Sequence, residues 1–98
     1  MVLMISYDLN GHERSKDYEV VKSFIERNSI SWARPLRSQW FVETSESPNW
    51  WTDQLRKLID QDDRLFVCRI PPNTNLYQPS YQGYLDNEIW NWLNPRVR

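Results

Sequence analysis

The sequence holds few of the residues that build metal, disulfide or nucleotide sites. It has one cysteine, Cys68, one histidine, His12, and only two glycines among 98 residues. A single cysteine allows no disulfide within the chain, and one cysteine with one histidine cannot form a zinc site of the Cys/His kind. Two glycines are too few for a P-loop or a dinucleotide-binding loop. Any bound metal must therefore use carboxylates, carbonyls or a second subunit.

Long apolar runs and a strong charge of one sign are also missing. No stretch approaches the roughly 20 apolar residues that a membrane span needs, and the first residues lack the basic leader of a signal peptide. We therefore expect a cytoplasmic protein that makes no membrane contact. The net charge is −1, so any nucleic-acid footprint must be local rather than spread over the whole surface.

Aromatic residues are abundant, with six Trp, five Tyr and three Phe. Leu, Ile, Val and Phe total 24 of the 98 residues, which together with the tryptophans exceeds the roughly 20% below which chains stay disordered. We therefore expect a single folded domain with a largely aromatic core. A domain of this size buries only about two-thirds of its unfolded surface, which leaves a sheet face for a second copy to cover.

Hydrophobic spacing predicts four strands and three helices. The strand-like runs are 30–33, 39–43, 65–70 and 2–7, and the helical spacing covers 16–28, the residues from 48 onward and those after the N-cap Asp86. Ser47 followed by Pro48 predicts the start of the second helix, and Pro95 is expected to follow the last one. The near-continuous apolar run over 2–7 is typical of a central strand that is covered on both faces.

The order strand, helix, strand, strand, helix, strand predicts an α+β fold of the ferredoxin-like βαββαβ type. This is a sandwich of a four-stranded antiparallel sheet with two helices on one face. Residues 1–70 form this core. Residues 71–98 form a C-terminal loop and short helix, which we expect to pack on the core or on the partner subunit. The other sheet face is then left bare.

Asp8 follows the first strand directly, which places a carboxylate at the rim of the sheet. A two-fold axis between two such sheets would bring two copies of Asp8 together. Two carboxylates suit Mg²⁺, which binds oxygen ligands and keeps several waters. Such an ion generates hydroxide and neutralises charge on a phosphodiester. The alternative is an Asx-turn, in which the Asp8 side chain accepts hydrogen bonds from the next backbone amides.

Basic residues in the first part of the chain are the candidates for nucleic-acid binding, namely Arg14, Lys16, Arg34 and Arg37. Trp32 and Trp40 flank the last two, an arrangement that suits stacking of single-stranded bases. The alternatives are a solvated surface for the basic residues and a core or dimer interface for the tryptophans. Helical spacing turns Trp51 and Trp92 inward. It turns Trp50 and Trp90 away, toward the partner subunit or solvent.

Four segments, taken in order, carry a family resemblance over about residues 2–70. They are Ser6-Tyr7-Asp8-Leu9-Asn10, Lys16-Asp17-Tyr18, Ser38-Gln39-Trp40-Phe41-Val42 and Asp62-Asp63-Arg64-Leu65-Phe66-Val67. With these segments the chain resembles the small proteins called SinR-like, which are similar to the CRISPR-associated Cas-two family.

The resemblance implies a ferredoxin-like homodimer in which the aspartate after the first strand, here Asp8, is catalytic and binds a metal with its dimer mate. For some members it implies a Mg²⁺-dependent endonuclease acting on RNA or DNA, and for others a scaffold for DNA integration. Two positions depart from the family pattern. A Glu that commonly follows the third-strand aromatic is Phe41 here, and an arginine pair after the first strand is reduced to Glu13-Arg14.

A competing hypothesis is a non-catalytic protein-interaction or adaptor module of a defence or toxin-antitoxin system. Its basis is the near-neutral net charge and the acidic C-terminal half of the chain, which offer little for contact with phosphates. Its partner would be another protein held by the aromatic C-terminal segment. A small-molecule regulatory domain is a third hypothesis, because this fold commonly serves that use.

Overall fold

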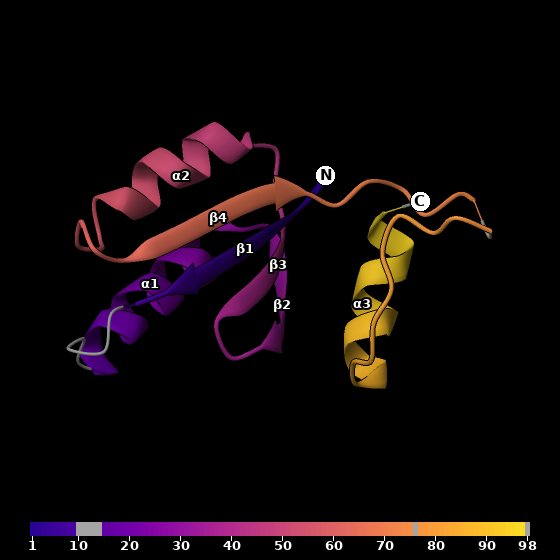
Figure 1. Ribbon diagram of the computed structural model, residues 1–98, viewed down its shortest axis with the longest axis horizontal. Coiled ribbons are helices and arrows are strands. Elements are labelled where there is room, and N and C mark those ends of the chain that lie inside the picture. Colours follow the sequence, from indigo (N-terminus) through magenta and orange to yellow (C-terminus); the bar gives the residue numbers. More distant parts are fainter. Residues whose placement is uncertain (10–14, 76, 98) are drawn as a thin grey trace.

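The computed structural model describes residues 1–9, 15–75 and 77–97 of the chain. Within these residues a small α+β domain contains four strands and three helices (Figure 1). Their order is β1 (Val2–Asp8), α1 (Ser15–Asn28), β2 (Ser31–Leu36), β3 (Gln39–Glu43), α2 (Pro48–Arg56), β4 (Arg64–Arg69) and α3 (Asn87–Arg96). The predicted α+β class and the four-stranded antiparallel sheet are confirmed.

The strands are arranged in the order β2-β3-β1-β4, and each pair of neighbours is antiparallel. β1 therefore lies between two strands, with Ile5 opposite Trp40 of β3 and opposite Val67 of β4. Side chains alternate between the two faces of a strand. The odd-numbered side chains of β1 are apolar or aromatic, and Val2 and Met4 make the start of the other set apolar as well, which fits the central position of the strand.

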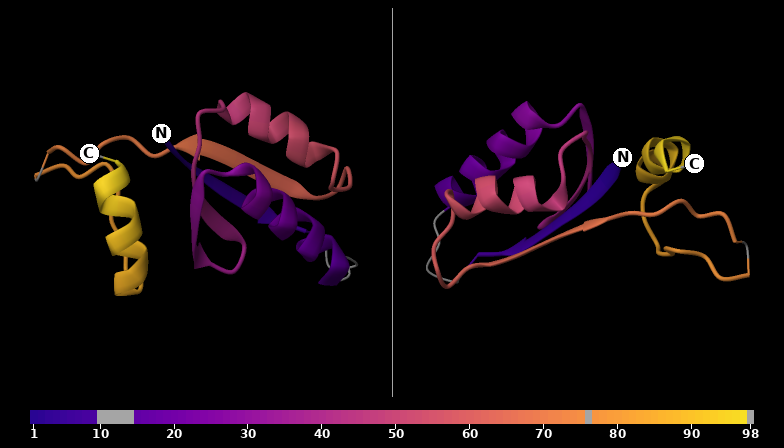
Figure 2. Two further views of the ribbon diagram at one scale, coloured as in Figure 1. Left: turned by 180° about the vertical axis from the view of Figure 1, so that it is seen from behind. Right: turned by 90° about the horizontal axis from the view of Figure 1, so that it is seen from above.

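One face of the sheet is covered by α1 and α2 (Figure 2, right). The odd-numbered side chains of β1 point to this side and pack with the apolar faces of both helices. The buried cluster consists of Leu3, Ile5, Tyr7, Leu9, Val21, Ile25, Trp40, Val42, Trp51 and Leu55. Trp40 and Trp51 are fully buried, so the expectation of an aromatic core is met on this side.

The opposite face of the sheet, here called the open face, is partly covered by α3. Leu93 and Val97 pack on Val2 and Phe41 to form a second, smaller buried cluster. Polar contacts reinforce it, because the Trp92 indole N–H donates to the Ser31 hydroxyl at 2.7 Å. The expectation of a fully bare second face is therefore wrong, since this C-terminal helix shields one end of it.

Arg96 anchors the end of α3 on the sheet. Its guanidinium donates to the carboxylate of Glu43 at 3.2 Å and lies 4.5 Å from the centre of the Trp92 ring. These contacts explain why α3 includes Pro95, which was expected to follow the helix. A proline in a helix removes one backbone hydrogen bond, and here the tertiary contacts of Arg96 hold the last turn in place.

The tryptophans on α2 pack together, although they were expected to diverge. Trp51 is in the core as predicted, and its indole N–H donates to the Thr44 hydroxyl at 3.2 Å. Trp50 was expected to face the partner or solvent, but its ring lies 6.2 Å from Phe24 and 5.3 Å from Trp51. That expectation is wrong because α1 lies beside α2 and widens the buried side of the helix.

The start of α2 follows the predicted signal. Ser47 is the N-cap, its hydroxyl accepts a hydrogen bond from the backbone N–H of Trp50 at 3.1 Å, and Pro48 occupies the first helical position. This arrangement satisfies one of the free amides at the helix start.

Ser47→Ala is expected to lower the free energy of unfolding by about 1 kcal/mol, because the amide of Trp50 loses its cap. Urea unfolding followed by circular dichroism measures the change. Ser45→Ala is the control, since Ser45 is an exposed serine in the same loop. Equal losses in the two variants would contradict the capping role.

Candidate functional site

Asp8 ends β1 at the rim of the open face. Leu3, Ile5 and Tyr7 point to the helices, so alternation along the strand turns Asp8 to the opposite side, together with Ser6. Asp8 is exposed. The structure therefore places this carboxylate at the sheet rim, as predicted, and on the face that α1 and α2 leave uncovered.

Tyr7 fixes the backbone that carries Asp8. Its hydroxyl oxygen accepts a hydrogen bond from the Trp40 indole N–H at 2.9 Å inside the core. Its backbone N–H donates to the carbonyl of Ser38 at 3.0 Å, and its ring lies 6.1 Å from that of Tyr18. The end of β1 is thus tied both to the core and to the turn between β2 and β3.

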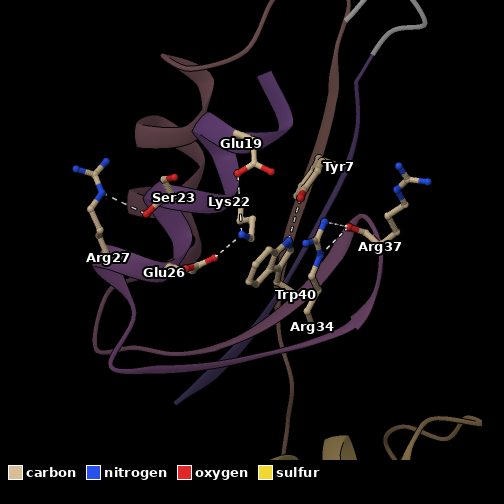
Figure 3. A network of polar contacts seen from close by, with 9 residues as sticks. All are labelled: Tyr7, Glu19, Lys22, Ser23, Glu26, Arg27, Arg34, Arg37 and Trp40. Atoms are coloured by element: carbon tan, nitrogen blue, oxygen red, sulfur yellow. Dashed lines mark hydrogen bonds and ion pairs between the residues drawn. The ribbon is translucent and has the colours of Figure 1, made fainter. Parts of the chain in front are cut away.

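The end of β2 and that turn carry Arg34 and Arg37, two of the candidate nucleic-acid-binding residues. The Arg34 guanidinium lies 4.7 Å from the centre of the Trp40 ring and donates twice to the carbonyl of Arg37, at 2.9 and 2.6 Å (Figure 3). The ring and the carbonyl together hold Arg34 in one orientation. The Arg37 side chain is exposed and extends away from this contact (Figure 3).

The Trp32 and Trp40 pair does not form the predicted stacking platform. The two rings are 5.1 Å apart with 59° between their planes, but Trp40 is fully buried beneath Trp32 and Arg34. Trp40 belongs to the core, where its N–H has a partner. Trp32 is 40% exposed, so it is the member of the pair that keeps surface for a base to contact.

The remaining candidates from the first part of the chain cannot be placed as side chains. Arg14 lies outside the described residues. Lys16 belongs to the first turn of α1, but its side chain is also outside what the structure describes. The backbone contact between Tyr7 and Ser38 places the turn that carries Arg37 at the same end of the sheet as Asp8, whereas Arg34 rests on Trp40 on the helix side, away from the open face that Asp8 occupies.

Basic side chains on the outer surface of α1 are engaged within the helix. Lys22 lies 4.0 Å from the carboxylate of Glu19 and 3.5 Å from that of Glu26 (Figure 3). Arg27 donates to the carbonyl of Ser23 at 3.2 Å. Such exposed pairs contribute little to stability, but they neutralise the positive charge of this helix surface. The free arginine of Figure 3 is therefore Arg37.

Arg64 is a candidate that the sequence reasoning missed. It begins β4 and lies directly opposite Asp8 in the antiparallel register, so the two side chains share the open face. Arg64 is exposed, and its guanidinium donates to the carbonyls of Asp62 and Asp63 at 3.3 and 3.4 Å. The signal was available, because an antiparallel first and fourth strand must place the end of one beside the start of the other.

Apolar side chains surround Asp8 and Arg64 on the open face. Phe66 is 63% exposed and Leu36 is 54% exposed, which is high for residues of this kind. Cys68 lies on the same face, and burial raises the pKa of its thiol above the ordinary value. The thiol is therefore protonated at neutral pH and acts as a small apolar group. Phe41 is buried in the second cluster with α3.

A cavity of about 310 Å³ lies at the border between the open face and the C-terminal segment. Its lining is mainly apolar and aromatic, and consists of Met4, Leu36, Gln39, Phe41, Ile70, Tyr81, Gln82, Gly83, Tyr84, Leu85, Trp90 and Leu93. Tyr81 and Trp90 stack at its wall, with ring centres 6.3 Å apart and 14° between the planes. Burial raises the pKa of the Tyr81 phenol.

The described residues contain no group of three or more His, Cys, Asp or Glu side chains placed to hold a metal ion. No helix in the described ranges is long and apolar enough to cross a membrane. The chain matches no protein-family model and no curated protein. Its function must therefore be argued from the geometry of Asp8, the neighbouring arginines and the apolar surface.

Proposed function

We propose that the chain is a cytoplasmic, homodimeric nucleic-acid-associated protein of the Cas-two type, in which the open faces of two copies meet. The observation that carries this proposal is the position of Asp8 at the exposed rim of a face that also exposes Phe66 and Leu36. Burial of these apolar side chains would drive association, and the same contact would bring the two Asp8 carboxylates toward each other.

The strand order supports the finer, ferredoxin-like description of the fold. In the order β2-β3-β1-β4, each of the two helices connects strands that are separated by one antiparallel neighbour. Both of these helices lie on one face (Figure 2). This is the arrangement expected for two interlocked βαβ units, and it leaves the other face for contact with α3 and a second copy.

The donor chemistry of the rim fits a hard cation only when two copies combine. Mg²⁺ takes oxygen ligands, usually one or two carboxylates together with waters and phosphate oxygens. One copy supplies the Asp8 carboxylate, and the dimer mate supplies the second. When bound, the ion would neutralise phosphodiester charge and promote ionisation of a water. Arg37 and Arg64 are exposed groups of the chain that would hold the phosphates, whereas Arg34 is held on the helix side by Trp40 and the Arg37 carbonyl.

Asp8→Ala is expected to reduce Mg²⁺-dependent cleavage of RNA or DNA by roughly 10- to 100-fold or more. Loss of a residue that only supports a metal ligand already costs about that much, and Asp8 would be a ligand itself. Wild type and variant are compared at matched purity on labelled RNA and DNA, with and without Mg²⁺. Asp53→Ala is the matched control, because Asp53 is an exposed acid on α2. Activity that survives Asp8→Ala would remove Asp8 from the mechanism.

Light scattering gives the independent check on the dimer. A mass of two chains at micromolar concentration is expected, and Phe66→Glu should shift the population toward one chain because it places charge on the contact surface. A monomeric wild type would contradict both the dimer and the shared carboxylate site. A dimer without cleavage activity would rule out the proposed nuclease activity but keep the proposed homodimer.

The second candidate function is a non-catalytic adaptor, the protein-interaction hypothesis. Tyr77 and Tyr84 favour it, because both are almost fully exposed on the segment between β4 and α3, and exposed aromatics are enriched at protein interfaces. DNA binding that weakens steeply with salt would argue against it, since phosphate contacts release counterions.

A further inference from the structure

The two edge strands of the sheet differ in their capacity to accept another strand. β2, at one edge, contains Pro35, and its register with β3 is irregular between Ala33 and Leu36. A proline lacks the N–H that a new strand would need, and irregular pairing discourages further addition. α3 also packs beside β2, where Trp92 donates to Ser31. This edge is closed to strand addition.

β4, at the other edge, is a regular six-residue strand without Pro or Gly. In the described part of the chain it pairs only with β1. The Ile70 N–H donates to the carbonyl of Val2 at 2.9 Å. In an antiparallel pair, successive residues of a strand direct their N–H and C=O groups alternately toward the partner and away from it, so the even-numbered residues of β4 bond to β1. The N–H and C=O groups of Leu65, Val67 and Arg69 therefore point away from the sheet.

The side chains along this edge define what a new strand must carry. Arg64 and Phe66 lie on the open face, and both are exposed. Arg69 is exposed, and it lies on the helix side of the sheet because it is opposite Leu3. β4 contains no acid, and a second copy paired along this edge would gather four arginines on two short strands. Asp8 already lies directly opposite Arg64, so Arg69, opposite the apolar Leu3, is the cation that an acidic residue of an added strand would complement.

A cavity of about 480 Å³ continues this edge beyond the start of β4. It lies between the end of α2 and the turn before β4, and is lined by Thr52, Arg56, Ile59, Asp60, Gln61, Asp63, Arg64 and Leu65. Arg56 and Arg64 are its cations. Of its two acids, Asp63 already accepts the backbone N–H of Asp60 at 2.8 Å.

We propose that the edge of β4 binds an extended, acidic segment of a partner protein by strand addition. The backbone of the segment bonds to the outward N–H and C=O groups of Leu65, Val67 and Arg69. An acidic side chain of the segment lies beside Arg69, on the helix side of the strand. Main-chain bonds supply affinity in this mode of recognition, and alternate side chains supply specificity. The proposal does not depend on nuclease activity.

The test uses the full chain and a labelled seven-residue peptide of alternating glutamate and valine, with acetyl and amide ends, in fluorescence anisotropy. Saturable binding is expected, and the matching lysine and valine peptide should bind at least about 10-fold more weakly. Two further versions carry N-methyl groups on one or the other set of alternate amides. At least one of them should lose about 10-fold or more, because its donors to β4 are gone.

Variants of the protein locate the contact. Val67→Pro removes an outward N–H without removing a bond to β1, so it should weaken the glutamate peptide about 10-fold while circular dichroism stays unchanged. Arg69→Glu should weaken it similarly, whereas Arg27→Glu, a matched charge reversal on α1, should not. The peptide comparisons and Arg69→Glu decide the outcome if Val67→Pro fails to fold.

Three results would overturn the proposal. The first is no binding of the glutamate peptide at millimolar concentration. The second is binding that is indifferent to N-methylation and to Arg69→Glu. The third is self-association of the wild type that Val67→Pro abolishes, because a second copy would then occupy the edge.

Discussion

Trp40→Ala is expected to lower the free energy of unfolding by about 3–5 kcal/mol, the usual cost of truncating a buried tryptophan. The ring is fully buried at the centre of the helix-side core. Its removal leaves a cavity, breaks the hydrogen bond to the Tyr7 hydroxyl and withdraws the surface on which Arg34 rests. A domain of this size has a total stability of roughly 5–15 kcal/mol, so the variant should lose a large fraction of it.

Urea unfolding followed by far-ultraviolet circular dichroism measures this loss without relying on the fluorescence of six tryptophans. Trp32→Ala is the matched control, because Trp32 contacts Trp40 but is 40% exposed. We expect it to cost about 1 kcal/mol, in the range of an aromatic pair contact. Similar losses in the two variants would contradict the assignment of Trp40 to the core.

Leu93→Asp is expected to detach α3 while the sheet and the other two helices stay folded. Leu93 is 1% exposed in a cluster that contains only three other buried residues. A carboxylate there loses its hydration among apolar groups, at a cost of several kcal/mol. The nearby cation, Arg96, is already bound to Glu43. The second cluster should fail before the larger one because it has fewer contacts to lose.

Hydrogen exchange read by mass spectrometry distinguishes this local release from global unfolding. Peptides covering α3 should lose their protection, whereas those covering β1 and β3 should keep most of theirs. Asn91→Asp introduces the same charge at an exposed position of α3 and should leave the pattern unchanged. Loss of protection in every strand would show instead that α3 and the sheet unfold as one cooperative unit.

Local patterns in the sequence predicted most elements of this fold. Ser47 and Pro48 located the start of α2, because capping chemistry acts within one turn. The run over 2–7 indicated a central strand, and β1 is paired on both sides. These features depend on neighbours in the sequence, so they are readable without tertiary structure.

Features that depend on distant residues were not predictable in the same way. The bond between Trp92 and Ser31 joins positions 61 residues apart, and no local pattern shows that α3 lies on the sheet. The retention of Pro95 in α3 and the partial covering of the open face follow from that contact. Trp50 was misassigned for a related reason, since the position of α1 beside α2 decides which side of the helix is buried.

The residues of the candidate site likewise differ in whether a local pattern or a distant contact decides their position. The position of Asp8 directly after the apolar run over 2–7 put it at the rim of the sheet, and pairing of strand ends would have found Arg64. The burial of Trp40 was harder to predict, because residues 40–42 are all apolar and their spacing does not show which of them meet the helices. In the structure the Trp40 indole N–H donates to the Tyr7 hydroxyl and Arg34 lies over the ring, contacts that no local pattern shows.

The central position of β1 also governs when this domain becomes foldable during synthesis. Leu3 pairs with Arg69, and Val2 packs with Leu93 and Val97, so its partners lie far along the chain. Contacts between distant residues form slowly, because the loop between them must close first. On the ribosome, β1 emerges before these partners and exposes both apolar faces while it waits, a condition that invites aggregation or chaperone binding. Of the four strands, the earliest to be made thus waits the longest for its last partners.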